Sequence, residues 1–107
     1  MRDNIKFVLF ADKDSQRARA VLCFCEANGI EYELIELGIL GGGARTAEYA
    51  KINPLQKVPA LQEVDKTTGE VVFTLTETHA IMRYLATVCK VSDHWYPEEP
   101  RKRARVD

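Results

Sequence analysis

The sequence predicts an α/β fold: a mixed four-stranded sheet with helices on both faces. In the first half, a short apolar run, a segment of helical periodicity and a second short run follow one another, which is the βαβ pattern of a parallel strand pair. In the second half, a turn-rich loop joins two strand-like runs, which indicates an antiparallel hairpin. A helix with one apolar face follows this hairpin.

The first strand is expected over residues 5–10, Ile-Lys-Phe-Val-Leu-Phe, because a short apolar run flanked by charge is typical of a largely buried strand. Helical spacing begins after Ser15, and either Ser15 or Asp14 is a plausible N-cap. Asn28 and Gly29 are expected to end this helix with a left-handed turn. Its apolar positions are Ala18, Val21, Leu22 and Cys25.

A second strand is expected at about residues 31–36, where Tyr32, Leu34 and Ile35 are apolar. The three glycines at 41–43 then break the chain. A short helix over 44–51 is expected to end before Pro54, because the residue before a proline disfavours helical angles.

Residues 58–61 and 71–75 read as two further strands, and residues 65–69 between them form the hairpin loop. The last helix starts near Glu77 and has a single apolar face: Ala80, Ile81, Tyr84, Leu85 and Val88. The resulting order, βαβ-α-ββα, is that of a thioredoxin-like fold.

Length and composition indicate one globular domain. The chain has 107 residues and a net charge of −1, which gives no general attraction to nucleic acid or to an anionic membrane. It contains no apolar stretch of about 20 residues, and its first residues lack the plan of a signal peptide, so a cytoplasmic protein is expected. Three cysteines without metal-site spacing fit a reducing compartment better than a disulfide framework.

Five strings of the chain carry a family resemblance: Ser-Gln at 15–16, Ile-Asn-Pro-Leu-Gln-Lys-Val-Pro-Ala-Leu at 52–61, Leu-Thr-Glu-Thr at 75–78, Asp-His-Trp-Tyr-Pro at 93–97 and Ala-Arg-Val-Asp at 104–107. Together they resemble the N-terminal domain of glutathione transferases, most closely the theta class. The resemblance implies that residues 1–90 form the thioredoxin-like domain. It also implies that residues 91–107 are a linker and the start of a helical second domain that this chain lacks.

The resemblance places the catalytic serine of these transferases at Ser15. Glutathione must react as a thiolate, whereas an ordinary thiol has a pKa near 8.5 and is mostly protonated at neutral pH. A hydroxyl donor at a helix N-terminus would favour the anion. A serine before a helix is otherwise simply its N-cap, and we expect the two roles to compete for one oxygen.

Val58 and Pro59 are assigned to peptide binding. The resemblance implies a cis Val58–Pro59 bond, which would turn the backbone of Val58 outward to pair with an extended peptide. Without the resemblance, a trans proline at a strand edge is the expectation. Lys57, just before them, suits the glycine carboxylate of glutathione, although a lone loop lysine is usually only solvated.

Glu77 and Thr78 are assigned to the γ-glutamyl end of glutathione. The α-carboxylate would lie on the free N–H groups of the last helix with the Thr78 hydroxyl as a further donor, and Glu77 would accept from the α-ammonium. The alternative is that both are ordinary first-turn residues favoured by the helix dipole.

The chain departs from the family pattern at the start of the first helix and at the glycine end of the site. Arg17 and Ala18 stand where the family often has proline and then cysteine or serine, so a preorganising proline is lost. Ala44 stands where theta-class relatives have a histidine, with Arg45 beside it as a possible substitute cation. Thr78 replaces the usual serine and keeps the hydroxyl.

Other reactive side chains point to no further chemistry. Cys23 and Cys25 diverge by about 200° on a helix and lie outside the Cys-x-x-Cys position, so a dithiol function is disfavoured and structural roles are expected. His79 and His94 have no third ligand at metal-site spacing, so no metal is expected.

The resemblance implies a cytoplasmic detoxification enzyme that uses glutathione as co-substrate, conjugates it to electrophilic small molecules through the second domain, and forms a homodimer at full length. The isolated chain is expected to have little or no conjugating activity, and no nucleic acid or membrane partner is expected. A scaffold or protein-interaction module with a vestigial glutathione site is the alternative. It would have no chemical need for all six site residues.

Overall fold

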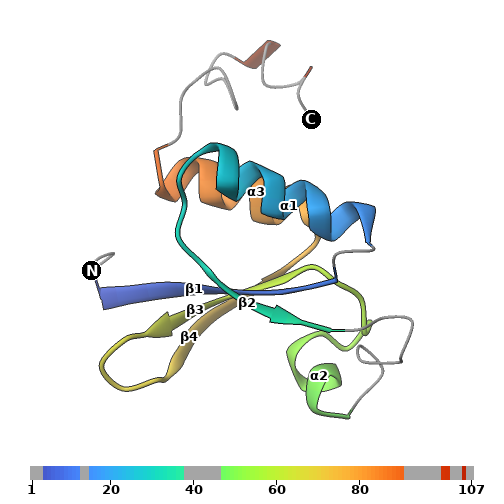
Figure 1. Ribbon diagram of the computed structural model, residues 1–107, viewed down its shortest axis with the longest axis vertical. Helices are drawn as coiled ribbons and strands as arrows, with labels where there is room; N and C mark the ends of the chain where they lie inside the picture. The colour runs from blue at the N-terminus through green and yellow to red at the C-terminus, as the bar shows by residue number, and fades with distance from the viewer. Residues whose placement is uncertain (1–3, 13–14, 38–46, 91–99, 102–104, 106–107) are drawn as a thin grey trace.

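The computed structural model describes residues 4–12, 15–37, 47–90, 100, 101 and 105. Strands and helices follow one another in the expected order (Figure 1). They are β1 (Ile5–Ala11), α1 (Gln16–Ala27), β2 (Glu33–Glu36), α2 (Ala47–Ile52), β3 (Ala60–Asp65), β4 (Val71–Thr76) and α3 (Thr78–Val88).

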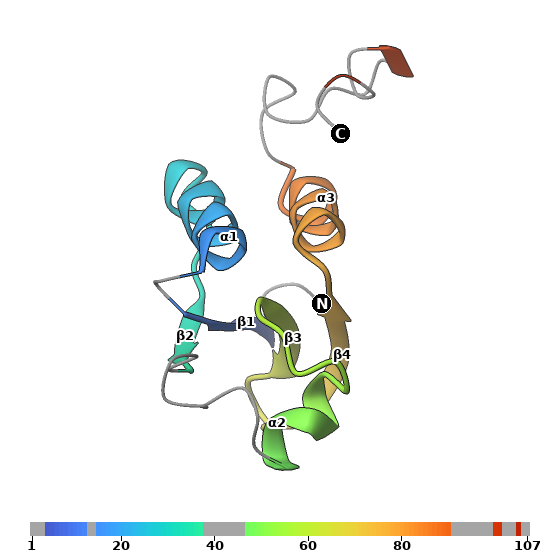
Figure 2. The same ribbon diagram turned by 90° about the vertical axis from the view of Figure 1, so that its right-hand side faces the viewer.

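The four strands form one mixed sheet in the order β2-β1-β3-β4. β1 pairs with β2 in parallel, whereas β1 with β3 and β3 with β4 pair antiparallel. Helices α1 and α3 lie side by side on one face of the sheet, and α2 lies on the other (Figure 2). The predicted thioredoxin-like α/β fold is confirmed.

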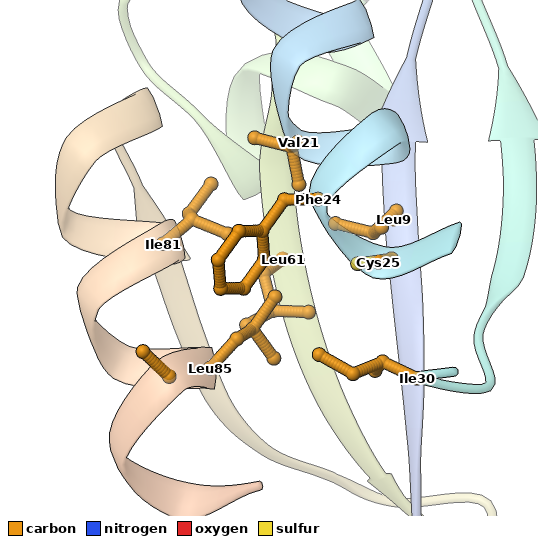
Figure 3. Close-up of a cluster of buried hydrophobic side chains, with 9 residues drawn as sticks. Leu9, Val21, Phe24, Cys25, Ile30, Leu61, Ile81 and Leu85 are labelled. Carbon is orange, nitrogen blue, oxygen red and sulfur yellow. The ribbon is translucent and has the colours of Figure 1, made fainter. Parts of the chain in front are cut away.

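The core is divided by the sheet into two clusters. Leu9 and Leu61 point toward α1 and α3, where they meet Val21, Phe24 and Cys25 of α1 and Ile81 and Leu85 of α3 (Figure 3). The neighbouring strand residues Val8, Phe10 and Ala60 point the other way and pack with Tyr49 of α2. This alternation follows from the period of two along a strand.

Helix α1 begins and ends at the expected residues. Ser15 is its N-cap, with an extended backbone, and its Oγ accepts a hydrogen bond from the Ala18 N–H at 3.3 Å. Asp14, the other candidate, lies outside the described residues. Gly29 has a φ of 65°, the left-handed conformation expected after the helix.

The third strand was predicted wrongly. It runs from Ala60 to Asp65 rather than over residues 58–61, so Val58 and Pro59 precede it. The polar pair Gln62 and Glu63 interrupts the apolar pattern, although both residues pair with β1. Glu63 is buried, and the Tyr84 hydroxyl of α3 offsets the cost by donating a hydrogen bond to its carboxylate at 2.7 Å.

Several expectations fall on residues that the structure does not describe: the glycines at 41–43, Ala44 and Arg45 at the start of the short helix, His94, and most of the predicted linker and domain start over 91–107. The short helix itself is present as α2, shifted to Ala47–Ile52. Within the described ranges, none of the helices has the length and apolar character needed to cross a membrane.

Replacing Leu61 by alanine should lower the free energy of unfolding by about 2–5 kcal/mol, because this fully buried side chain would leave a cavity between the sheet and its two helices. Leu55→Ala is the matched control, since Leu55 is 65% exposed and should change stability by less than about 0.5 kcal/mol. Urea denaturation measures both. An equal loss of unfolding free energy in the two variants would contradict the central place of Leu61 in the core.

Candidate functional site

The candidate site lies at the carboxyl end of β1, and strand register explains why distant segments meet there. Ala60 pairs with Phe10 on one side and with Thr76 on the other. The residues just outside this row therefore share one edge of the sheet: the turn into α1, the loop before β3 and the start of α3. Figure 1 shows α1 and α3 beginning at this same end.

A shallow groove contains five of the six predicted site residues. It is lined by Arg17, Asn53, Leu55, Lys57, Val58, Pro59, Glu77 and Thr78. The groove itself is small, with a cavity volume of about 20 Å³. A wider cleft of about 400 Å³ lies beside the groove, between α1 and the start of α3. Arg17, Glu77 and Thr78 line both the cleft and the groove.

The loop before β3 is held by its own carbonyl oxygen. The Lys57 C=O accepts hydrogen bonds from the Tyr49 hydroxyl at 2.6 Å and from the Asn53 side-chain amide at 2.9 Å. Asn53 is 4% exposed, and its Oδ1 also accepts from the Leu55 N–H at 3.1 Å. Burial raises the pKa of Tyr49 to about 12, although the hydrogen bond with Asn53 acts in the opposite direction. Tyr49 thus remains a protonated donor at neutral pH.

Val58 anchors the groove through its side chain and leaves its backbone available. Its side chain is buried in the cluster on the α2 face. The Val58–Pro59 peptide bond is cis, which confirms the expectation drawn from the resemblance. Neither the N–H nor the C=O of Val58 bonds to a described residue, so both can pair with an extended ligand. The Lys57 side chain is exposed beside them.

Helix α3 begins without a side-chain cap. Its N-cap is Glu77, which has a φ of 78° and makes no capping hydrogen bond. A positive φ at a non-glycine residue is strained, and such strain is common at functional sites. The Ile81 N–H donates to the Glu77 carbonyl. The N–H groups that precede it in α3 have no such partner within the helix and are free to bind an anion.

Ser15 lies at the margin of this arrangement. It does not line the groove or the cleft, but Gln16 and Arg17, which follow it, line the cleft. Its oxygen accepts from Ala18 and can still donate its own proton, because a hydroxyl has one donor and two acceptor positions. The helix cap uses an acceptor position of the Ser15 hydroxyl, whereas a thiolate would use its donor. The two roles therefore compete less for this oxygen than the sequence alone indicates.

Sequence reasoning missed three residues of the site. Tyr49 and Asn53 act through a backbone carbonyl, which leaves no periodic pattern in a sequence. The Asn-Pro pair at 53–54 belongs to a string that carries the resemblance, but the sequence assigns it no role beyond ending a helix. Arg17 was read only as a lost proline, although it lines both the groove and the cleft.

The three cysteines and His79 form no second site among the described residues. Cys25 is buried, and burial, with smaller contributions from Cys89 and Glu26, raises the pKa of its thiol to about 12. Cys23 is exposed on the same helix. Among the residues that the structure describes, no cluster of His, Cys, Asp or Glu could hold a metal ion.

The chain matches known proteins along most of its length. The glutathione S-transferase N-terminal domain family matches residues 6–87. Glutathione S-transferase theta-3 of Mus musculus is 43% identical over 99 residues, which cover 92% of this chain and 38% of the mouse protein. The chain therefore spans well under half the length of this relative.

Solved structures give the same result. Human glutathione S-transferase T1-1 in its apo form superimposes with a TM-score of 0.81 at 42% identity, over 94% of this chain and 39% of that one. Human glutathione transferase theta-2, in complex with glutathione and an unknown ligand, gives a TM-score of 0.83 at 39% identity, over 94% and 38%.

Tyr49→Phe should lower the free energy of unfolding by about 1 kcal/mol, because it removes a part-buried hydrogen bond to Lys57 O without changing the ring. Tyr32→Phe is the matched control, since it removes only an exposed bond to Glu26 and should cost less than about 0.5 kcal/mol. Urea denaturation measures both. A larger loss from Tyr32→Phe would contradict the role given to Tyr49.

Proposed function

The chain belongs to the glutathione S-transferase family, of which it carries the N-terminal domain, and on that premise we propose that it binds glutathione and activates its thiol. One observation carries the proposal. The groove brings the unpaired backbone of Val58 together with the uncapped start of α3, although these segments are far apart in the sequence. An extended peptide with a charged group at each end fits such a site.

Glutathione is placed with its cysteine backbone paired to the N–H and C=O of Val58, and Pro59 shapes the groove beside it. Its glycine carboxylate lies toward the exposed Lys57 ammonium. Its γ-glutamyl carboxylate accepts from the free N–H groups of α3 and from the Thr78 hydroxyl, while Glu77 accepts from the α-ammonium. Each charged group of the ligand thus has a partner of suitable chemistry.

Ser15 is proposed to stabilise the thiolate. Its oxygen is held by Ala18, so its hydroxyl proton is free to be donated to the sulfur. The positive end of the α1 dipole acts on the same charge. Both effects favour the anion over the neutral thiol, so the pKa of glutathione should fall on binding.

The activity of a whole transferase is a wider proposal. The chain covers 38% of its mouse relative. We therefore propose that conjugation needs surfaces of a second domain, and that the 107 residues alone have little activity. A cytoplasmic detoxification role belongs to the same proposal.

Homodimer formation is also proposed, with β4 as one contact. Three consecutive apolar side chains of this edge strand are exposed: Val71, Val72 and Phe73. An unpaired edge strand with exposed apolar residues is suited to burial against another protein surface.

Calorimetric titration with glutathione tests the site. The unaltered chain should bind, and Thr78→Val should weaken binding by about tenfold, because the variant keeps the shape but loses a hydroxyl donor to a charged group. No detectable binding by the unaltered chain would overturn the proposal and favour the scaffold alternative.

The ultraviolet absorbance of the thiolate, followed against pH, tests the activation. The pKa of bound glutathione should lie below that of free glutathione, and both Ser15→Ala and Ser15→Gly should remove most of the difference. The glycine variant separates the loss of the hydroxyl from the loss of the helix cap, since glycine at an N-cap costs only a few tenths of a kcal/mol, roughly. If the pKa of bound glutathione were the same in both variants as in the unaltered chain, the helix dipole rather than the Ser15 hydroxyl would be responsible for lowering it.

A further inference from the structure

We propose that Arg17 is an additional anchor for the γ-glutamyl α-carboxylate and makes the site selective for peptides that carry this group. The inference rests on the proposed binding of glutathione. It goes beyond it by assigning to Arg17 a role that none of the expected site residues fills.

The position of Arg17 is the first argument. Arg17 lines both the groove and the adjoining cleft, and in both it shares the lining with Glu77 and Thr78. It therefore belongs to the α1 side of the space into which the free N–H groups of α3 point. An anion bound at the start of α3 would lie between that helix and the guanidinium.

The local environment of Arg17 is the second argument. It occupies the second position of α1, in a first turn that contains no acidic residue. A cation at a helix N-terminus opposes the helix dipole and is locally unfavourable. Arg17 is exposed, and it has no ion-pair or hydrogen-bond partner among the described side chains that would offset this cost. A residue that breaks a local rule without compensation within the fold is a candidate for ligand binding.

Charge balance is the third argument. The carboxylate on the N–H groups of α3 would lie close to the carboxylate of Glu77, and the two like charges would repel. A guanidinium on the opposite side offsets this repulsion and can bind a carboxylate through two parallel hydrogen bonds. Arg17 and Glu77 would then bind the carboxylate and the ammonium of one α-amino acid group.

The family pattern gives the position of Arg17 a second meaning. The family that the chain resembles often has a proline at this position, and a proline carries neither charge nor donor. Here the preorganised helix start is replaced by a cation that faces the ligand space. The expected consequence is a stronger dependence of binding on the α-carboxylate.

Arg17→Gln tests the proposal against two ligands. One is glutathione, and the other is 4-aminobutyryl-cysteinyl-glycine, which lacks only the α-carboxylate. Calorimetry on the full chain should show about three- to tenfold weaker binding of glutathione, the size expected for an exposed charge-assisted contact. Binding of the second ligand should be unchanged. Arg17→Lys should restore part of the affinity for glutathione.

Arg19→Gln is the matched control. It removes the same charge from the same helix, but Arg19 lines neither the groove nor the cleft, so glutathione affinity should be unchanged. Urea denaturation should show no loss of stability in Arg17→Gln, because the variant removes a cation from the first turn.

Equal losses for the two ligands, or an unchanged affinity for glutathione, would overturn the role of Arg17 while leaving glutathione binding intact. No binding by the unaltered chain would overturn the proposed function and this inference together. A loss of folding in Arg17→Gln would also count against the inference, since it would show that Arg17 is structural.

Discussion

The pairing of Leu9 with Leu61 at the centre of the sheet is the constraint on which the rest of the structure depends. These residues face each other across the antiparallel β1–β3 pair, and both are buried beneath α1 and α3. A slip of β3 by one residue would move Leu61 to the opposite face of the sheet. The hydrophobic contact therefore fixes the register, and the register places Ala60 beside Phe10 and Thr76. Through this row, the core determines that the loop before β3 and the start of α3 meet at one edge.

Much of the fold follows from sequence patterns because the apolar periods are regular. Strands β1 and β4 begin and end within two residues of the prediction, and helix α3 begins within one residue of it. Prediction fails where a polar residue is buried with a partner from elsewhere in the chain. Glu63 is such a residue. It interrupts the apolar pattern of β3, so the strand is predicted too short, and its hydrogen bond with Tyr84 exists only in the tertiary structure.

The site was predictable to a similar extent, and for a similar reason. Five of the six groups that would touch a ligand lie in two short strings, at 57–59 and 77–78, whereas the groups that hold these strings lie outside them. Tyr49 and Asn53 position the loop through the carbonyl of Lys57, a contact that no spacing rule reveals. The cis bond before Pro59 could be expected from the resemblance alone, because base rates favour the trans form. Arg17 acquires meaning only once α1 and α3 are seen to share a cleft.

The central claim is that three separate segments form one peptide-binding site at the carboxyl end of β1. An NMR titration of the ¹⁵N-labelled chain with glutathione tests it most directly. The amide resonances of Val58 and Thr78 should shift together with that of Arg17, while those of Gly29 and Lys66, which line a cavity of different residues, should remain in place. Shifts confined to Gly29 and Lys66, or no shifts at all, would contradict the account.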